Sequence, residues 1–322
     1  MTFPLRYIAQ LRLPGWEQER LSGSSALLIG VGGLGLPAAL YLAAAGIGRL
    51  LLADPDVVAE ENFHRQPLYT PEDLGTLKVE RLATHLRKLR PDLSIETYPT
   101  WIDEANLPQI GREADIWIDG TDNLHSRLVI DAIAFTLQKP WVYGAVYQWE
   151  GQAAIFQGVR YRDFFGEAEG GPSCSEGGVL GAVPGLIGSL QAALATIFLS
   201  TPAAAPFNRL FRIDLRKGEM DTFAFGPSTL SLELSLEQAS QLPEVTWIDL
   251  RDTLEPSLPF PTRRLPWYAW ENWELPPTPV VLLCEAGNRS RQIAFALRKR
   301  TGRRDIYSLR GGASVVFRPN MG

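Results

Sequence analysis

The feature that most constrains the fold is a glycine-rich turn between a predicted strand and a predicted helix. Gly30-Val31-Gly32-Gly33-Leu34-Gly35 follows the apolar run 26–30 and leads into the apolar stretch 34–45. Glycines at this spacing permit a tight turn and let backbone N–H groups approach a phosphate closely. The order strand, glycine turn, helix therefore predicts a parallel sheet whose first turn binds a nucleotide.

Strand-like and helix-like segments continue to alternate over the first two thirds of the chain. Strands are expected at 26–30, 49–54, 95–98, 115–118 and 141–146, and helices at 34–45, 78–90 and 123–138. This alternation predicts an α/β fold with a doubly wound, mostly parallel, Rossmann-like sheet covered by helices on both faces. Two later strands, 208–215 and 220–225, are expected to be antiparallel.

The pattern restarts after residue 228, which predicts a second, smaller α/β domain. The expected domains are 1–228 and 229–322. In the second, strands are expected at 245–250 and 306–309, and Ser235 is expected to cap a short helix. The segment 255–279 is dense in proline and tryptophan and is expected to be irregular.

The second domain contains a cysteine in a setting that favours reactivity. Cys284 follows the apolar run 280–283 and precedes a helix expected at 290–301. Backbone N–H groups at a helix N-terminus stabilise a thiolate, the reactive form of sulfur. A buried structural thiol is the plain alternative. A phosphatase loop does not fit, because it requires arginine six residues after the cysteine and position 290 is Ser290.

Charge and cysteine content exclude several classes of function. The net charge of −5 argues against nucleic acid or an anionic membrane as a partner. The two cysteines, Cys174 and Cys284, cannot build a disulfide framework or a four-thiolate zinc site. The apolar segment 180–199 has the length of a membrane span, but Pro184 and Gly185 interrupt it, so a buried helix is preferred. No signal-peptide pattern is recognisable, and the cytoplasm is the expected location.

Charged residues after the strands indicate which nucleotide the turn binds. Asp54 ends the second strand, where a carboxylate can hold ribose hydroxyls. Arg65 and Lys78 follow, and Asp122 comes directly after the fourth strand. Cations and a carboxylate beside a nucleotide suit a triphosphate with Mg²⁺, and a hydride-transfer site needs neither. A nicotinamide-dependent oxidoreductase is the alternative, distinguished by NAD binding without Mg²⁺.

Residues 6–225 resemble the ThiF/MoeB/HesA family, bacterial relatives of ubiquitin-activating enzymes. The resemblance covers about two thirds of the chain and runs through Arg6-Tyr7, 30–35, 54–56, 62–66, 75–78, 121–123, 150–152 and 185–191. It implies a homodimer that uses Mg-ATP to adenylate the C-terminal glycine of a small ubiquitin-like protein. The implied nucleotide-binding residues are Gly30, Gly32, Gly33, Gly35, Asp54, Asp56, Asn62, Arg65, Gln66, Lys78, Asp122 and Asn123. Of these, Arg65, Lys78 and Asp122 are implied to be catalytic, with Asp122 nearest Mg²⁺ and the reacting carboxylate.

Two departures from the family's sequence pattern affect which of the family's properties the resemblance implies for this chain. Members usually read Arg-Tyr-x-Arg-Gln near the start, and the second arginine reaches the partner subunit's ATP. This chain has Ala9 there, so either Arg6 or Arg12 substitutes or adenylation is weakened. Many members also carry two Cys-x-x-Cys pairs that bind structural zinc. This chain has neither pair, and no zinc is expected.

Residues 229–317 resemble a rhodanese-like domain through 248–252, 284–290 and 309–312. In such domains the cysteine carries a persulfide whose outer sulfur is held by loop N–H groups. The segment 255–279 lacks a clear counterpart of the family's usual segment.

Cys174 belongs to the resemblance with the ThiF/MoeB/HesA family. It lies in the expected mobile loop 166–178, where a cysteine of that family serves as acceptor or relay for the activated carrier.

Together the two resemblances imply an enzyme that adenylates and then sulfurates a ubiquitin-like sulfur carrier ending in Gly-Gly. The acyl adenylate of the carrier meets a Cys284 persulfide, directly or through Cys174, and resolution by a reducing thiol leaves a thiocarboxylate on the carrier. A cysteine desulfurase or another persulfide donor is the expected source. The pathway stays open among molybdopterin, thiamin, cysteine and tRNA thiolation. An enzyme that only adenylates, with a second domain that docks the carrier, is the alternative.

Overall fold

The computed structural model describes residues 4–165, 177–225, 232–251, 257–285 and 287–317. The chain divides into two compact units, one formed by 1–160 and 170–224 and the other by 161–169 and 225–322. Each unit has its own sheet and its own apolar core. The domain boundary expected after residue 228 lies outside the described residues and stays a prediction.

The first unit is built on one sheet of eight strands in the order β3-β2-β1-β4-β5-β6-β7-β8. Neighbours from β3 to β5 are parallel, and those from β5 to β8 are antiparallel. The strands are β1 (Ser25–Ile29), β2 (Arg49–Ala53), β3 (Ser94–Tyr98), β4 (Ile116–Asp119), β5 (Trp141–Tyr147), β6 (Glu150–Phe156), β7 (Arg209–Asp214) and β8 (Glu219–Ala224). The expected mostly parallel α/β sheet and the two late antiparallel strands are confirmed, whereas β6 was not predicted.

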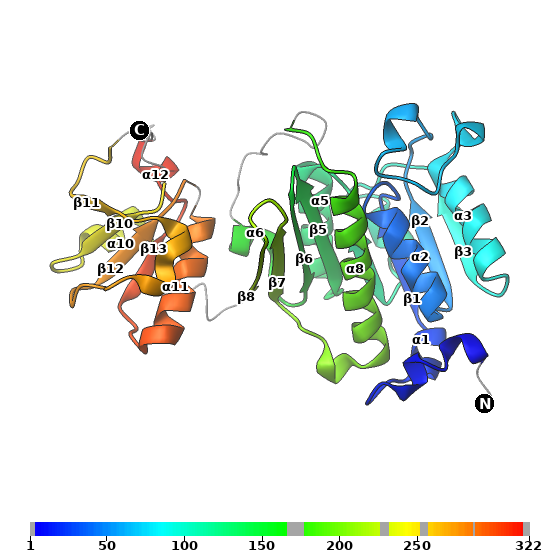
Figure 1. Ribbon diagram of the computed structural model, residues 1–322, viewed down its shortest axis with the longest axis horizontal. Helices are drawn as coiled ribbons and strands as arrows, with labels where there is room; N and C mark the ends of the chain where they lie inside the picture. The colour runs from blue at the N-terminus through cyan, green and yellow to red at the C-terminus, as the bar shows by residue number, and fades with distance from the viewer. Residues whose placement is uncertain (1–3, 166–176, 226–231, 252–256, 286, 318–322) are drawn as a thin grey trace. The chain divides into compact units, whose positions relative to one another are not determined.

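Helices cover both faces of this sheet (Figure 1). They are α1 (Gln18–Ser22), α2 (Gly35–Ala45), α3 (Lys78–Leu89), α4 (Leu107–Ile110), α5 (Leu124–Thr136) and α8 (Ala182–Ser200). The unit also has short 3₁₀ turns: η1 (Leu5–Tyr7), η2 (Gln10–Arg12), η3 (Glu60–Asn62), η4 (Pro71–Asp73) and η5 (Pro202–Ala204). Helix α2 contacts both α3 and α8, and α4 contacts α5.

Helix α8 is the apolar segment with the length of a membrane span. It contacts α2 and the strands β5 and β6, and its residues Ile187 and Gln191 are completely buried. A long apolar helix that packs on both a sheet and another helix is what the core of an α/β unit requires. The buried-helix interpretation therefore agrees with the contacts that α8 makes.

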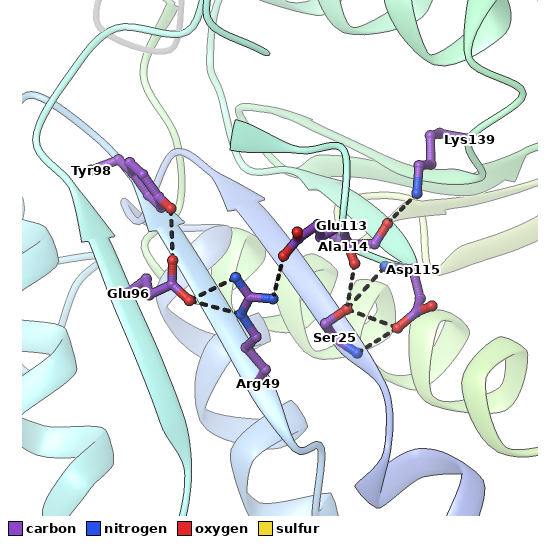
Figure 2. Close-up of polar contacts among 8 residues, drawn as sticks. All are labelled: Ser25, Arg49, Glu96, Tyr98, Glu113, Ala114, Asp115 and Lys139. Atoms are coloured by element: carbon purple, nitrogen blue, oxygen red, sulfur yellow. Dashed lines mark hydrogen bonds and ion pairs between the residues drawn. The ribbon is translucent and has the colours of Figure 1, made fainter. Parts of the chain in front are cut away.

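Polar side chains near the amino ends of the parallel strands pair with one another (Figure 2). Arg49 Nε donates to Glu96 Oε1 at 2.8 Å and its Nη1 to Glu113 Oε2 at 3.0 Å, while Ser25 N and Oγ both donate to Asp115 Oδ2 at 2.8 Å. Hydrogen bonds, first from Tyr98 and then from Arg49, lower the pKa of Glu96. This edge of the sheet thus uses its charges to hold β1, β2, β3 and β4 together.

The second unit contains a parallel sheet of five strands in the order β11-β10-β12-β13-β9. Its elements are α6 (Tyr161–Phe165), β9 (Glu233–Leu234), α10 (Leu236–Ser240), β10 (Thr246–Asp249), β11 (Thr262–Arg264), η6 (Trp267–Asn272), β12 (Val280–Leu283), α11 (Asn288–Thr301), β13 (Ile306–Leu309) and α12 (Ser314–Phe317).

The strands expected at 245–250 and 306–309 are confirmed. Ser235 caps α10, as expected, by accepting a hydrogen bond from Gln238 N at 3.1 Å. The expectation that 255–279 is irregular is wrong in part, because β11 pairs with β10 and η6 follows it.

Helix α6 belongs to the second unit although it follows β6 in the chain. Its Phe164 ring stacks on Phe225 with centroids 4.5 Å apart. Arg291 on α11 donates from Nη1 to the carbonyl oxygens of Asp163, at 2.6 Å, and of Phe164. The same guanidinium pairs with the buried carboxylate of Glu233, Nε to Oε1 at 2.8 Å. A buried ion pair and an aromatic stack therefore hold α6 in this unit.

Candidate functional site

A pocket lies at the carboxyl edge of β1, β2 and β4 in the first unit. The residues that line it include most of the predicted nucleotide-binding set: Gly30, Gly32, Gly33, Asp54, Asp56, Asn62, Arg65, Gln66, Lys78, Asp122 and Asn123. Gly35, the remaining member, begins α2. The sheet thus brings together in one cavity residues as far apart in sequence as Gly30 and Asn123, as expected for the carboxyl edge of a doubly wound sheet.

The glycine turn needs its glycines for steric reasons. Gly30 has a φ of +86°, a conformation that residues with a Cβ rarely adopt. A Cβ at Gly35 would overlap the carbonyl oxygen of Gly30, and one at Gly33 would lie 3.0 Å from Pro184 Cβ. The turn can therefore close only without side chains at these positions, which leaves its backbone open to the pocket.

Substitution of Gly35 by alanine is expected to destabilise the first unit by about 1–3 kcal/mol, because the new Cβ displaces the backbone of Gly30. The measurement is urea-induced unfolding monitored by tryptophan fluorescence, which gives the free energy of unfolding. Gly185→Ala is the matched control, since a Cβ at Gly185 in α8 has nothing within 4 Å. This control should leave the free energy of unfolding unchanged or raise it by up to about 1 kcal/mol. Equal stability of the two variants would contradict this reading of the turn.

Asp54 connects the glycine turn to the end of β2. Its Oδ2 accepts a hydrogen bond from Val31 N and its Oδ1 one from Asp56 N, both at 2.8 Å. Burial raises the pKa of this carboxyl, and the positive charge of Lys78 opposes the shift. The two backbone bonds leave further lone pairs on both oxygens, so Asp54 can orient the turn and still accept from a ligand hydroxyl.

Two of the predicted cations approach the pocket in different ways. Lys78, the first residue of α3, is buried, and its Nζ lies 2.8 Å from Asp56 Oδ2. Arg65 is half-buried and donates from Nη1 to the carbonyl oxygen of Glu61 at 2.9 Å. Both cations are therefore held at the pocket by contacts within the protein and carry charge that a phosphate can share.

The side-chain oxygens of the two predicted amides, Asn62 and Gln66, differ in their hydrogen bonding. Asn62 Oδ1 accepts a hydrogen bond from Ala59 N at 3.1 Å and closes the turn η3. Gln66 is buried, and its Oε1 has no hydrogen-bond partner within the described part of the chain. A buried acceptor without a partner costs free energy, so this oxygen in a pocket wall fits a ligand that donates a hydrogen bond.

Asp122 and Asn123 follow β4 and have separate roles. Asn123 is the N-cap of α5, where its Oδ1 accepts from Ser126 N at 2.8 Å. Asp122 is exposed and lines the pocket. Asn123 thus serves as a helix cap, and Asp122 is left as the residue after β4 whose carboxylate can meet a ligand in the pocket.

A buried ion pair beneath this loop was not predicted. Arg127 Nε lies 2.8 Å from Asp119 Oδ2, and Asp119 Oδ1 accepts from the Thr121 backbone N–H and hydroxyl at 3.0 and 2.6 Å. Gln191 of α8 donates to the carbonyl oxygen of Asp119 at 2.7 Å. These contacts fix the backbone that presents Asp122. A carboxylate inside an apolar strand was the only sequence signal for them.

In the second unit, Cys284 lies directly after β12 and is 5% exposed. The backbone N–H of Ser290, in the first turn of α11, is 3.4 Å from its Sγ, and the Ser290 hydroxyl is 3.6 Å from it. That hydroxyl also lies 2.8 Å from the hydroxyl of Ser308 on β13. The sulfur therefore faces donors at the N-terminus of a helix of fourteen residues, as the sequence predicted.

The backbone of the Cys284 loop is held by the turn after β13. The carbonyl oxygen of Cys284 accepts from Ala313 N at 2.8 Å, and a Cβ at Gly312 would overlap that oxygen. Arg251 Nη1 lies 4.0 Å from Glu285 Oε2 and its Nη2 lies 2.9 Å from Asp249 Oδ2. The three segments that carry the rhodanese resemblance thus meet around one loop. Cys174 lies outside the described residues.

Comparison with known proteins identifies relatives of the first unit. The ThiF family model matches residues 6–230. A sulfur carrier protein adenylyltransferase of Thermus thermophilus is 41% identical over 202 residues, covering 58% of this chain and 74% of that protein. An adenylyltransferase and sulfurtransferase of Xenopus laevis is 43% identical over 197 residues, covering 58% of this chain and 44% of that protein. The chain likewise spans about half the length of other curated relatives that it matches.

A solved structure gives the same fold at lower identity. The crystal structure of E. coli MccB with AMPCPP and MccA superimposes with a TM-score of 0.62 at 19% identity, covering 70% of this chain and 72% of that chain. At this identity the likeness concerns the fold alone. It agrees with the Rossmann-like, mostly parallel sheet of the first unit.

Proposed function

This chain belongs to the ThiF family, and from that premise we propose that it adenylates a sulfur-carrier protein and then transfers sulfur to it. The substrate is the C-terminal glycine carboxylate of a small ubiquitin-like protein, and the product is its thiocarboxylate. The observation that carries the proposal is a single pocket that gathers the glycine turn, Asp54, Lys78 and Asp122. The sulfurtransferase half rests on Cys284, whose sulfur accepts a hydrogen bond from the backbone N–H of Ser290.

The pocket residues fit ATP. A glycine turn without Cβ atoms presents backbone N–H groups to phosphates. The partnerless Oε1 of Gln66 and the free lone pairs of Asp54 suit hydroxyl donors such as those of a ribose. Lys78 and Arg65 both line the cavity and supply positive charge to it. These groups match the parts of a nucleoside triphosphate in kind and in order.

The residues also fit a magnesium ion that arrives with the nucleotide. Within the described residues, no group of three or more His, Cys, Asp or Glu side chains is placed to hold a metal by itself. Mg²⁺ in nucleotide sites needs only one or two carboxylates, since phosphates and water complete its coordination. Asp122 is the carboxylate that would hold it, and the ion would supply charge neutralisation on the phosphates.

Adenylation makes a poor electrophile reactive. A carboxylate oxygen of the carrier attacks the α-phosphorus of ATP, an acyl–phosphate bond forms, and the bond between the α- and β-phosphates breaks. The electron pair leaves on pyrophosphate, where Lys78 and Arg65 stabilise the added charge. When pyrophosphate takes this charge, Lys78 can exchange Asp56 for it, because that ion pair borders the cavity.

Sulfur transfer requires a persulfide on Cys284, supplied by a cysteine desulfurase or another persulfide donor. The outer sulfur attacks the acyl carbon, AMP leaves, and the carrier is joined to Cys284 through an acyl disulfide. A thiol then attacks the Cys284 sulfur, so that the carrier leaves as a thiocarboxylate and a new disulfide holds Cys284. That thiol is Cys174 or a small external thiol, and a reductant of the thiol class regenerates both cysteines. The Ser290 N–H stabilises the anionic sulfur of Cys284.

ATP–pyrophosphate exchange tests the adenylation half directly. We expect Mg-dependent exchange with at least one small protein ending in Gly-Gly from the same genome, and none when the terminal glycine is removed. NAD binding without Mg²⁺, together with no exchange, would replace this proposal by an oxidoreductase. Exchange without any thiocarboxylate from a persulfide donor would favour an enzyme that only adenylates.

The proposal extends to assembly and location. We place the enzyme in the cytoplasm as a homodimer in which Arg6 or Arg12 of one subunit replaces the arginine missing at Ala9. Both arginines are exposed and lie in the short 3₁₀ turns η1 and η2. Exchange activity that falls on dilution, in step with dissociation of a dimer measured by sedimentation, would support this part.

A further inference from the structure

The side chain of Trp101 is unusual for its place in the first unit. It follows β3, lines the pocket, and is 63% exposed. Ile102, the next residue, is 7% exposed and anchors the loop in the interior. A large indole that lies in a pocket wall and still faces solvent offers a flat apolar surface to whatever enters.

The backbone that carries this indole is held by hydrogen bonds within its own loop. Asn106 Nδ2 donates to the carbonyl oxygen of Trp101 at 2.7 Å. Asp103 Oδ1 accepts from the N–H groups of Ala105 and Asn106 at 2.9 and 2.8 Å, and Asp103 N donates to Asn106 Oδ1 at 3.0 Å. The loop is therefore preorganised, which reduces the entropy lost when a ligand contacts the ring.

The order of strands places the ring at one end of a line of ligand-binding groups. Reading β4, β1, β2, β3 across the sheet, the groups that follow each strand are Asp122, the Gly30–Gly33 turn, Asp54 and Trp101. A nucleotide has the same linear order: metal and outer phosphates, inner phosphate, ribose, base. Neighbouring strands are about 5 Å apart, so β3 lies about 10 Å from β1, roughly the span from an α-phosphate to a base.

We infer that Trp101 stacks on the base of the bound nucleotide and is a major source of its affinity. The inference rests on the proposed function, since it takes the pocket as the nucleotide site. Stacking of an aromatic side chain on a base depends on the π-face and tolerates any base. Trp101 thus contributes to the binding of a nucleotide and nothing to the binding of its phosphates alone.

The experiment measures dissociation constants by calorimetry for ATP, AMP and inorganic tripolyphosphate, all with Mg²⁺. Trp101→Ala should raise the dissociation constants of ATP and AMP by roughly 10- to 100-fold and leave that of tripolyphosphate unchanged. Trp101→Phe should restore most of the affinity, because a phenyl ring also stacks. Trp149→Ala is the matched control: this indole is 44% exposed and does not line the pocket. Its nucleotide affinities should equal those of the unchanged protein.

Three outcomes would overturn the inference while leaving the pocket a nucleotide site. These are an unchanged ATP affinity in Trp101→Ala, an equal loss for tripolyphosphate, and a higher KM for the carrier at an unchanged KM for ATP. The last would make Trp101 a carrier contact. Failure of the unchanged protein to bind any nucleotide would instead remove the proposed function, so the two failures are distinguishable.

Discussion

Replacement of Cys284 by serine is expected to lower thiocarboxylate formation on the carrier by on the order of 10³-fold or more. A hydroxyl cannot hold the transferable sulfur of a persulfide, so the step that gives sulfur to the acyl adenylate has no donor. ATP–pyrophosphate exchange should stay within about twofold of the unchanged protein, because Cys284 does not line the nucleotide pocket. The fold should be preserved, since serine is close in shape and the Ser290 N–H can donate to its oxygen.

The measurement is mass spectrometry of the carrier after incubation with ATP, a persulfide donor and a reducing thiol. Cys174→Ser is the companion variant, and it separates direct transfer from a relay. Full activity of Cys174→Ser would show that an external thiol resolves the acyl disulfide. Thiocarboxylate formed by Cys284→Ser at an undiminished rate from the persulfide donor would remove the second unit from the chemistry. Loss of both activities in Cys284→Ser would contradict the division of labour between the units.

Replacement of Asp122 by asparagine is expected to lower ATP–pyrophosphate exchange by about 10²- to 10³-fold. The amide keeps the size of the side chain and removes the charge that would hold Mg²⁺ beside the reacting carboxylate. The free energy of unfolding should change by less than about 0.5 kcal/mol, because Asp122 is exposed. The loss should therefore appear in kcat and in the magnesium dependence, with the fold intact.

The exchange assay is run over a series of Mg²⁺ concentrations. Glu104→Gln is the matched control, since Glu104 is an exposed acid on the loop after β3 that does not line the pocket. It should exchange at the rate of the unchanged protein. If Asp122→Asn exchanges as fast as this control at every Mg²⁺ concentration, Asp122 has no part in metal binding or adenylation.

That these residues gather in one pocket could be predicted from sequence, because they follow strands whose pattern is plain. Asp54 and Asp122 come directly after apolar runs, and the carboxyl ends of parallel strands meet at one edge of a sheet. The Ser235 cap and the Cys284 loop were predictable because both depend on a local sequence pattern at a helix N-terminus.

What escaped prediction depends on contacts between distant segments. The carboxylate of Asp119 in an apolar strand was visible in the sequence, but nothing in the local pattern indicated that Arg127 pairs with it. Strand β11 forms from Thr262–Arg264, three polar residues among prolines, because β10 offers an edge that pairs with it. Local propensity is weak there, and the neighbouring strand determines the conformation.

The place of α6 has a consequence for how the protein is made. Translation delivers Tyr161, Phe164 and Phe165 before any other described part of the second unit. The described strands of the first unit are complete once β8 leaves the ribosome, and Phe225 follows β8 directly, whereas Arg291, the other partner of α6, is synthesised much later. During that interval the aromatic side chains of α6 lack most of the second unit that packs against them. Exposed apolar segments of this kind are bound by chaperones. The second unit is therefore completed only when its last helices are synthesised, and its earliest segment waits for them.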